Sequence, residues 1–323
     1  MPFDGILGQG PAVQTLTRAL TSGLVHHAYR FEGPPGVGKE RAAFALAQAL
    51  VCERAEPLGC GACPACHRAR TLSEDEPHVP LHPDVVLVGR GLYPASVISA
   101  SEASGISVEQ VRRVILARVG FPPHEGRALV FIVRDADALT PSAANALLKT
   151  LEEPSARTHF VLLTSRPHRL LDTVRSRTLA VRFGPLPDAV IADILRSHGK
   201  PLAVTRLAEG SASLALELAD EERLRARSAF DEALREAMNA PDLASAVTLG
   251  DQRGESRDAL REQLTFVAHG FAERCREQAR DAPALAEREA RRHAEVLRAL
   301  FELERNAQPA LVVESMVARL RRA

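Results

Sequence analysis

A glycine-rich segment near the N-terminus, Gly33-Pro34-Pro35-Gly36-Val37-Gly38-Lys39, is the feature that most constrains how this chain can fold. A run typical of a strand, residues 27–32, precedes it, and an alanine-rich helical segment, residues 41–51, follows it. Closely spaced glycines let backbone N–H groups curl around phosphate groups, and a lysine balances the phosphate charge. The order of strand, loop and helix therefore predicts a phosphate-binding loop of the Walker A type. A plain glycine turn is the alternative.

The positions that handle magnesium in such a loop are altered. The Walker A pattern ends in Ser or Thr, whose hydroxyl ligates the ion, but this chain has Glu40 there. The strand at residues 128–133 should be followed by an Asp and a Glu that bind magnesium and activate water. Instead, Arg134-Asp135-Ala136-Asp137 follows it. We expect that ATP can at most bind over residues 33–40, without efficient hydrolysis. If the strand ends one residue later, Asp135 takes the metal position and Ala136 replaces the catalytic Glu.

Strand and helix patterns alternate along the first half of the chain. The patterns predict strands at 27–32, 84–88, 128–133, 158–164 and 178–183, and helices at 11–24, 41–51, 107–119 and 142–152. Such alternation predicts an α/β fold with a doubly wound parallel sheet. At Gly184-Pro185-Leu186-Pro187 the pattern breaks, and only helices are expected beyond it.

Length and composition agree with several domains. The chain has 323 residues, of which 46% are hydrophobic. This length is too great for a single domain with one ordinary core. We expect domains at 1–183, 184–221 and 222–323. The formal net charge is zero, which argues against a protein that grips DNA alone. The start resembles no signal peptide and no run of apolar residues is long enough to span a membrane, so we expect a cytoplasmic protein without membrane contact.

Four of the five cysteines, Cys52, Cys60, Cys63 and Cys66, crowd together after the helix that follows the glycine loop. Two gaps of two residues let thiolates converge on a tetrahedral ion. Four sulfur ligands leave no open position for water, so we predict a structural zinc module at 52–66. Four reduced thiols without metal are the alternative. The residues around the cluster, such as Glu53 and Glu56, are not basic enough to favour a DNA-binding module.

Residues 144–154, Ala-Asn-Ala-Leu-Leu-Lys-Thr-Leu-Glu-Glu-Pro, closely resemble the segment after Walker B in bacterial DNA polymerase III clamp-loader subunits, which are AAA+ proteins. His27-Ala28-Tyr29 and Ser176-Arg177-Thr178 also resemble that family. The resemblance covers residues 3 to about 220 well and is weaker beyond. It implies a helical lid over 184–221 and a C-terminal all-α collar for oligomerisation over 222–323. The cysteine module also lies where gamma and delta prime subunits carry one.

The resemblance further implies a ring of five subunits with ATP sites at the interfaces, each completed by a neighbour's arginine. Arg177 lies at that position, although Thr178 replaces the cysteine that the family has next. Arg177 would therefore act in trans on ATP bound by another subunit, with a surface arginine paired to a carboxylate as the alternative. Thr164 lies near the position that senses the gamma phosphate, and Gly8-Gln9 resembles a segment near the adenine, with core packing equally possible.

Two functions follow from the resemblance. The altered motifs favour a delta prime type of subunit that supports ATP-dependent loading of the sliding clamp but hydrolyses little ATP itself. Its partners would be gamma/tau and delta subunits in a heteropentamer, with the clamp and primer-template DNA contacted through the assembled complex. The alternative is a catalytically active gamma/tau-type ATPase that uses Lys39 with Asp135 and Asp137.

Overall fold

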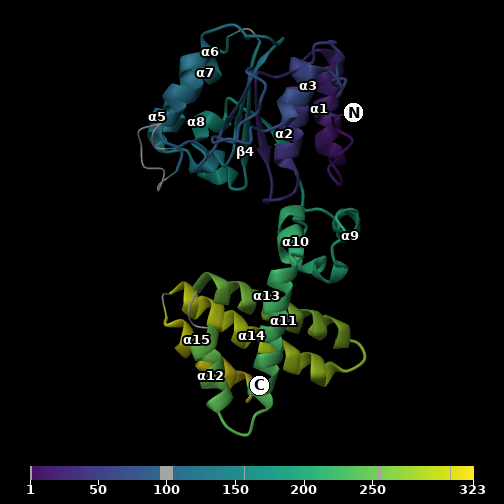
Figure 1. Ribbon diagram of the computed structural model, residues 1–323, viewed down its shortest axis with the longest axis vertical. Helices are drawn as coiled ribbons and strands as arrows, with labels where there is room; N and C mark the ends of the chain where they lie inside the picture. The colour runs from purple at the N-terminus through teal and green to yellow at the C-terminus, as the bar shows by residue number, and fades with distance from the viewer. Residues whose placement is uncertain (1, 95–104, 156, 254–256, 306) are drawn as a thin grey trace. The chain divides into compact units, whose positions relative to one another are not determined.

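The computed structural model describes residues 2–94, 105–155, 157–253, 257–305 and 307–323 (Figure 1). The chain divides into two compact units. The first contains Met1–His198 and Ala208–Leu214, and the second contains Gly199–Leu207 and Ala215–Ala323. The division into three domains, with boundaries near 184 and 222, stays a prediction.

A five-stranded sheet forms the centre of the first unit. All strand pairs are parallel, and the order is β2-β3-β4-β1-β5. This is the order of an AAA+ sheet, so the predicted α/β class is confirmed. All five predicted strands are present, with ends that differ by at most one residue. They are β1 (Ala28–Glu32), β2 (Val85–Val88), β3 (Leu129–Val133), β4 (Thr158–Thr164) and β5 (Leu179–Arg182).

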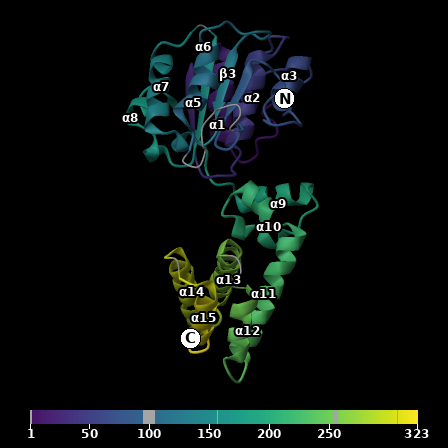
Figure 2. The same ribbon diagram turned by 60° about the vertical axis from the view of Figure 1, so that its left-hand side comes forward.

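Both faces of the sheet are covered by helices (Figures 1 and 2). One face carries α1 (Gly10–Ser22), α2 (Lys39–Val51) and α3 (Pro64–Arg70). The other carries α5 (Val108–Gln110), η2 (Val111–Leu116), α6 (Ala117–Val119), α7 (Pro141–Glu152) and α8 (Asp172–Arg175). The single helix predicted over 107–119 has a π-helical middle part, η2. Apolar periodicity could not show this, because a π-helical turn adds one residue without changing the type of side chain.

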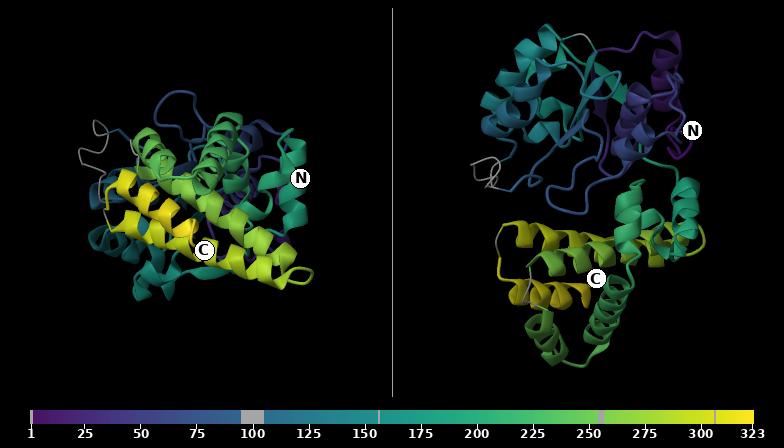
Figure 3. Two further views of the ribbon diagram at one scale, coloured as in Figure 1. Left: turned by 90° about the horizontal axis from the view of Figure 1, so that it is seen from below. Right: turned by 45° about the horizontal axis from the view of Figure 1, so that its top comes forward.

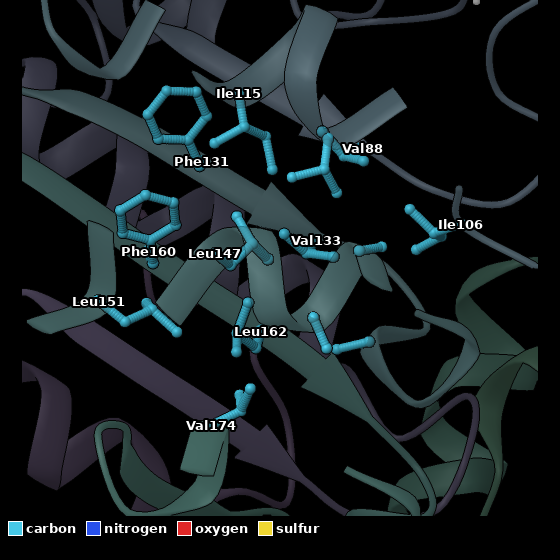
Figure 4. Packing of buried hydrophobic residues seen from close by; sticks show 14 of the residues in the cluster. Val88, Ile106, Ile115, Phe131, Val133, Leu147, Leu151, Phe160, Leu162 and Val174 are labelled. Carbon is cyan, nitrogen blue, oxygen red and sulfur yellow. The ribbon is translucent and has the colours of Figure 1, made fainter. Parts of the chain in front are cut away.

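The central strand β3 shows why the sheet is buried on both sides. All five of its residues are buried, as expected for a parallel strand with helices on both faces. Phe131 and Val133 point into a cluster that also contains Ile115 and Leu147 (Figure 4). The ring of Phe131 stacks on that of Phe160 from β4, with 5.0 Å between the centroids. This core fixes the two ends of the sheet, where the candidate sites lie.

Shorter elements complete the first unit around the ends of the strands. They are η3 (Ala136–Ala138), η4 (Pro167–Arg169) and α9 (Asp188–Ser197). The turn at Glu209-Gly210-Ser211 has positive φ angles at its first two residues, 46° and 77°. It leads into α10 (Ala212–Leu218), within which the division between the units falls.

The second unit is helical. After β5, the described residues contain no strand, as predicted. Helices α13 and α14 lie antiparallel and pack along their lengths, and α12 packs on α15 (Figure 3). Asp220 caps α11 by accepting a hydrogen bond from the Arg223 N–H at 3.2 Å. The elements are η5 (Leu202–Val204), η6 (Arg206–Ala208), α11 (Glu221–Asn239), α12 (Ala244–Arg253), α13 (Arg257–Gln278), α14 (Pro283–Glu304) and α15 (Pro309–Leu320).

A core of its own holds the second unit together, built from Phe230, Leu264, Val296, Val313 and neighbouring buried residues. Within the part of the chain that the structure describes, no helix combines the length and the apolar character needed to cross a membrane.

Candidate functional site

The glycine loop connects the carboxyl end of β1 to the start of α2. Gly36 has φ 71°, and a Cβ atom there would lie 2.1 Å from the hydroxyl oxygens of both Ser211 and Ser213. The Ala212 N–H also donates to the Gly36 carbonyl at 2.9 Å. Only glycine fits this position, because any side chain would meet the start of α10. Sequence reasoning missed these two serines, because Ser211 lies 175 positions beyond Gly36 in the chain.

Lys39, the lysine of the loop, is buried, with 9% of its surface exposed. Its Nζ donates to the Gly33 carbonyl at 2.6 Å and to the Pro34 carbonyl. Burial lowers the pKa of Lys39, while the carboxylates of Asp135 and Asp137 oppose that effect. The ammonium group therefore has hydrogen-bond acceptors within the loop and two carboxylates in its vicinity.

Glu40 and Arg134 pair directly with each other. Arg134 Nε donates to Glu40 Oε2 at 2.9 Å, and its Nη2 donates to Glu40 Oε1. Both side chains are partly exposed. Such a bidentate contact is the strongest form of a guanidinium–carboxylate pair. The two substitutions that the sequence places at the metal positions are thus in contact, and Arg134, not Asp135, is bonded to Glu40.

A further acidic residue at this edge, Asp137, accepts a hydrogen bond from the Thr164 hydroxyl at 2.6 Å. Thr164 is the last residue of β4 and is 1% exposed, and its oxygen also accepts from the Arg166 N–H at 3.0 Å. The hydroxyl predicted to lie near a gamma phosphate is therefore used within the protein.

Gln9 ties the glycine loop to the end of the sheet. Its Nε2 donates to the carbonyls of Val37 at 3.2 Å and Gly184 at 2.7 Å, and its Oε1 accepts from the Gly184 N–H at 3.1 Å. The residue is 3% exposed. This geometry agrees with the packing interpretation of the Gly8-Gln9 segment, because both ends of the amide already have backbone partners.

Arg177 lies between α8 and β5, at the amino edge of the sheet. Its Nη2 pairs with Glu152 Oε1 at 2.5 Å, and its Nη1 donates to the Thr173 carbonyl at 2.9 Å. About a third of the side chain, 34%, is exposed. The partner Glu152 ends α7 and belongs to the segment that carries the family resemblance, but its pairing with Arg177 could not be read from the sequence.

The arginine faces an open hollow of about 650 Å³, lined by residues from three segments of the chain: His26, His27, Leu151, Glu152, Ser176, Arg177, Thr178 and Leu179. The rings of His26 and His27 stack with 4.3 Å between their centroids. Burial lowers the pKa of His27, and the neighbouring His26 lowers it further. The hollow thus combines one guanidinium, one carboxylate, two imidazoles and two hydroxyl groups.

The four cysteines of the predicted module converge. Their Sγ atoms lie within 4.8 Å of one another, and 3.9 Å separates those of Cys60 and Cys66. A tetrahedral zinc site with Zn–S bonds of about 2.3 Å has sulfur atoms about 3.8 Å apart. Backbone N–H groups point at sulfur from Cys60 to Cys52 at 3.4 Å and from Cys63 to Cys60 at 3.3 Å. This donor set fits a metal bound by four thiolates.

The module is attached to α2. Cys52 follows the last residue of this helix, Cys63 caps α3, and Cys66 lies within α3. Gln48 of α2 donates its side-chain N–H to the Cys66 carbonyl at 2.8 Å. A hydrogen bond from the Ala62 N–H is the main reason that the pKa of the Cys60 thiol is lowered to about 7. Part of this thiol is therefore thiolate, the form that binds metal, at neutral pH.

The sequence matches a family described as "DNA polymerase III, delta subunit" over residues 8–187, more than half of the chain. The chain belongs to this family. The matched region contains the glycine loop, the cysteine module, the sheet and Arg177, and it ends next to the predicted break at residue 184.

Relatives of the DNA polymerase III family agree with this assignment. The chain is 32% identical to DNA polymerase III subunit delta' of Escherichia coli K12 over 242 residues, which is 72% of this chain and 66% of the relative. It is 33% identical to the gamma/tau subunit of Mycobacterium tuberculosis H37Rv over 202 residues, 61% of this chain and 32% of the relative. The alignments thus span just under two thirds of the first relative and about a third of the second.

A solved structure shares the fold. The crystal structure of a DNA polymerase III gamma subunit-related protein from Thermotoga maritima superposes with a TM-score of 0.51, covering 96% of this chain and 99% of that one. The sequence identity is 18%, so this likeness concerns the fold alone.

Proposed function

We propose that the chain acts as the delta prime subunit of a DNA polymerase III clamp loader, in which it supports ATP-dependent loading of the sliding clamp. In this proposal Arg177 acts on ATP bound by a neighbouring subunit, and the chain's own glycine loop does not support hydrolysis. The partners would be gamma/tau and delta subunits in a five-subunit ring. The clamp and primer-template DNA would be contacted through that assembly, in the cytoplasm.

The position of Arg177 relative to the glycine loop carries this proposal. Strands β1 and β5 are parallel and in register from Tyr29↔Leu179 to Glu32↔Arg182. Arg177 precedes β5, whereas the loop follows β1, so the two lie at opposite ends of the sheet. A strand of four or five residues separates its ends by roughly 15 Å, farther than an arginine side chain reaches. Arg177 could therefore act only on a phosphate that another molecule holds.

The Glu40–Arg134 pair supports the non-hydrolysing part of the proposal. In an active site of this type, a hydroxyl and a carboxylate at these positions would hold magnesium against the beta and gamma phosphates. Here a carboxylate and a guanidinium neutralise each other at the same place. A divalent cation would have to displace the guanidinium, and the guanidinium would then lie beside a like charge.

The alternative, an active gamma/tau-type ATPase, is favoured by one observation. Burial lowers the pKa of Lys39, and Asp135 and Asp137 both lie close enough to oppose that lowering, so carboxylates are present near the loop that could approach a metal ion. Asp137 is engaged by Thr164, which leaves Asp135 as the candidate ligand of this alternative.

We also propose that the four cysteines hold a structural zinc ion. The sulfur separations support this, and four protein ligands would leave no position for a reacting water molecule. The ion would stabilise the fold of 52–66 and would take no part in ATP chemistry.

ATP hydrolysis by the reconstituted complex tests the proposal. The complex would contain this chain, either unchanged or as Arg177→Ala, with gamma/tau and delta subunits from the same organism. DNA-stimulated turnover should fall strongly in the variant, because an arginine acting in trans contributes about 10³ to 10⁵ in rate in GTPases. Arg175→Ala is the matched control, since that side chain pairs only locally with Asp172, and it should preserve turnover.

The isolated chain should show no turnover with or without DNA. Full activity of the Arg177→Ala complex would overturn the role of Arg177 in trans. Turnover by the isolated chain that disappears in Lys39→Ala would favour the active-ATPase alternative.

A further inference from the structure

A buried arginine, Arg30, lies beneath the loop that carries Arg177. It belongs to the central part of β1 and is 7% exposed. A guanidinium cannot be buried at low cost unless its charge is balanced and its N–H groups have acceptors. The Arg30 Nε donates to Glu32 Oε1 at 2.6 Å, which balances the charge. The question is what the remaining N–H groups do.

The Nη1 group of Arg30 holds the Arg177 loop on both sides. It donates to the Arg175 carbonyl at 2.8 Å and to the Thr178 hydroxyl oxygen at 2.6 Å. These acceptors lie two residues before and one residue after Arg177. A single rigid group on the sheet therefore fixes the backbone at both ends of a short segment whose centre carries the arginine.

Thr178 completes the arrangement because its hydroxyl is used in both directions. The oxygen accepts from Arg30, and the proton is donated to the Val174 carbonyl at 2.9 Å. Thr178 is buried, with 8% exposure. The Arg177 N–H donates to the same Val174 carbonyl at 3.2 Å, so the backbone of Arg177 is tied to the group that Thr178 holds.

We propose that Arg30 and Thr178 are positioning residues for Arg177, and that the hydrogen bond between them sets the direction in which the Arg177 side chain leaves the sheet. This inference rests on the proposed role of Arg177 in trans. Neither residue needs to touch the neighbour's nucleotide. Their effect is to keep the loop in one conformation while the guanidinium of Arg177 stays partly exposed.

The proposal also gives a physical account of Thr178. The resembling family has cysteine at this position, and a thiol is a weak hydrogen-bond acceptor. In this chain a buried guanidinium points at the position, so an oxygen acceptor is required. Arg30 and Thr178, 148 residues apart, therefore form one unit, and replacing either residue alone would leave the other without its partner.

Two variants of Thr178 separate positioning from general stability. Thr178→Val keeps the shape of the side chain and removes the acceptor, whereas Thr178→Ser keeps the hydroxyl and removes a methyl group. Each would be assembled with gamma/tau and delta subunits, alongside the unchanged chain and Arg177→Ala. The measurements are kcat and KM for DNA-stimulated ATP hydrolysis, and incorporation of the chain into the complex by gel filtration.

The expected result is a fall in kcat of at least about tenfold for Thr178→Val, since a displacement near 1 Å costs up to about 100-fold. Incorporation and KM should be unchanged, and Thr178→Ser should restore kcat to within about twofold of the unchanged chain. If the Thr178→Val variant does not fold, Thr178→Cys is used instead, because the cysteine thiol is still a weak hydrogen-bond acceptor. A lower kcat, rescued by serine, is again expected.

The outcomes distinguish this inference from the function on which it rests. If Arg177→Ala has full activity, the role of Arg177 in trans fails. If Arg177→Ala is slow but Thr178→Val or Thr178→Cys has normal kcat, the role of Arg177 stands and the positioning inference is overturned. Equal losses in the serine and valine variants would also overturn it, because the hydroxyl would then not be the determinant.

Discussion

The two ends of the same parallel sheet differ in whether their charged side chains have partners within the chain or face an open hollow. At the carboxyl end, the glycine loop is contacted by Ser211 and Ser213, Lys39 donates to loop carbonyls, and Glu40 pairs with Arg134. At the amino end, Arg177 lies partly exposed beside an open hollow. Under the proposed function, the comparison teaches that a substitution at one end of the sheet can remove ATP hydrolysis without disturbing an arginine at the other end, because the sheet separates them.

Removal of the cysteine cluster should have the largest effect on stability. It should act mainly on residues 52–66 and on α2, which leads from the glycine loop to the cluster. In Cys60→Ser/Cys66→Ser, or on strong chelation, residues 52–66 should unfold, because zinc-finger peptides gain on the order of 10 kcal/mol from their metal. The loss should loosen α2, which joins the module to the glycine loop. Hydrogen exchange of α2 and α3, together with zinc content, is the measurement.

The loop that carries Arg177 should retain its protection in the same experiment, since Arg30 of β1 holds it by hydrogen bonds. Cys275→Ser is the matched control and should keep the zinc content of the unchanged chain. Equal zinc content in the double variant and the control would contradict a four-cysteine site.

Restoring the metal position should change the carboxyl end. In Glu40→Thr/Arg134→Asp, a hydroxyl and a carboxylate replace the ion pair, and affinity for ATP should become magnesium-dependent. We expect at least about a tenfold gain, about 1.4 kcal/mol, from calorimetric titration with magnesium and with a chelator. Glu40→Gln/Arg134→Gln removes the pair without supplying a metal ligand and should show no such dependence. Identical behaviour of both variants would mean that the pair does not block the site.

A fall in pH should destabilise the fold through His159, which lies near the amino end of β4. Burial lowers the pKa of His159, with a smaller opposing effect from its hydrogen bond to the His26 carbonyl. Because the folded-state pKa lies below the unfolded value of about 6.5, the unfolded chain binds the proton more readily, and stability present above about pH 6.5 is lost as the pH falls. One proton contributes a slope of at most about 1.4 kcal/mol per pH unit.

Urea unfolding between pH 7.5 and 5.5 measures that slope. His159→Asn keeps an N–H that can donate to the His26 carbonyl and removes the titrating group, so its free energy of unfolding should depend less on pH. The same slope in both proteins would show that acid acts elsewhere.

The smallest effect is expected from replacing Glu152, which pairs with Arg177 in the isolated chain. Glu152→Gln should change the free energy of unfolding by less than about 1 kcal/mol, because the pair is partly exposed. In the complex, the released guanidinium should lower the KM for ATP, since it no longer has to leave a carboxylate. The adjacent Glu153→Gln is the control. Equal KM values in the two variants would mean that the Glu152–Arg177 pair does not oppose binding of ATP in the complex.

The sequence by itself determined the elements whose signals are local. The five strands, the glycine loop and the cysteine cluster could be predicted because apolar runs, glycine spacing and short cysteine gaps reflect the backbone within a few residues. The sequence also predicted that Glu40 and Arg134 replace metal-binding residues, and its family resemblance predicted that Arg177 acts in trans.

Only the tertiary structure decided which of these residues meet. Glu40 and Arg134 are 94 residues apart in the chain, and Arg30 and Thr178 are 148 apart. Their contacts depend on the order of strands in the sheet, which places β1 next to β5 and separates it from β3 only by β4. Periodicity along the chain carries no information on this order. The contacts between distant segments, an ion pair at one end of the sheet and a guanidinium–hydroxyl hydrogen bond at the other, therefore appear only when the strands are assembled.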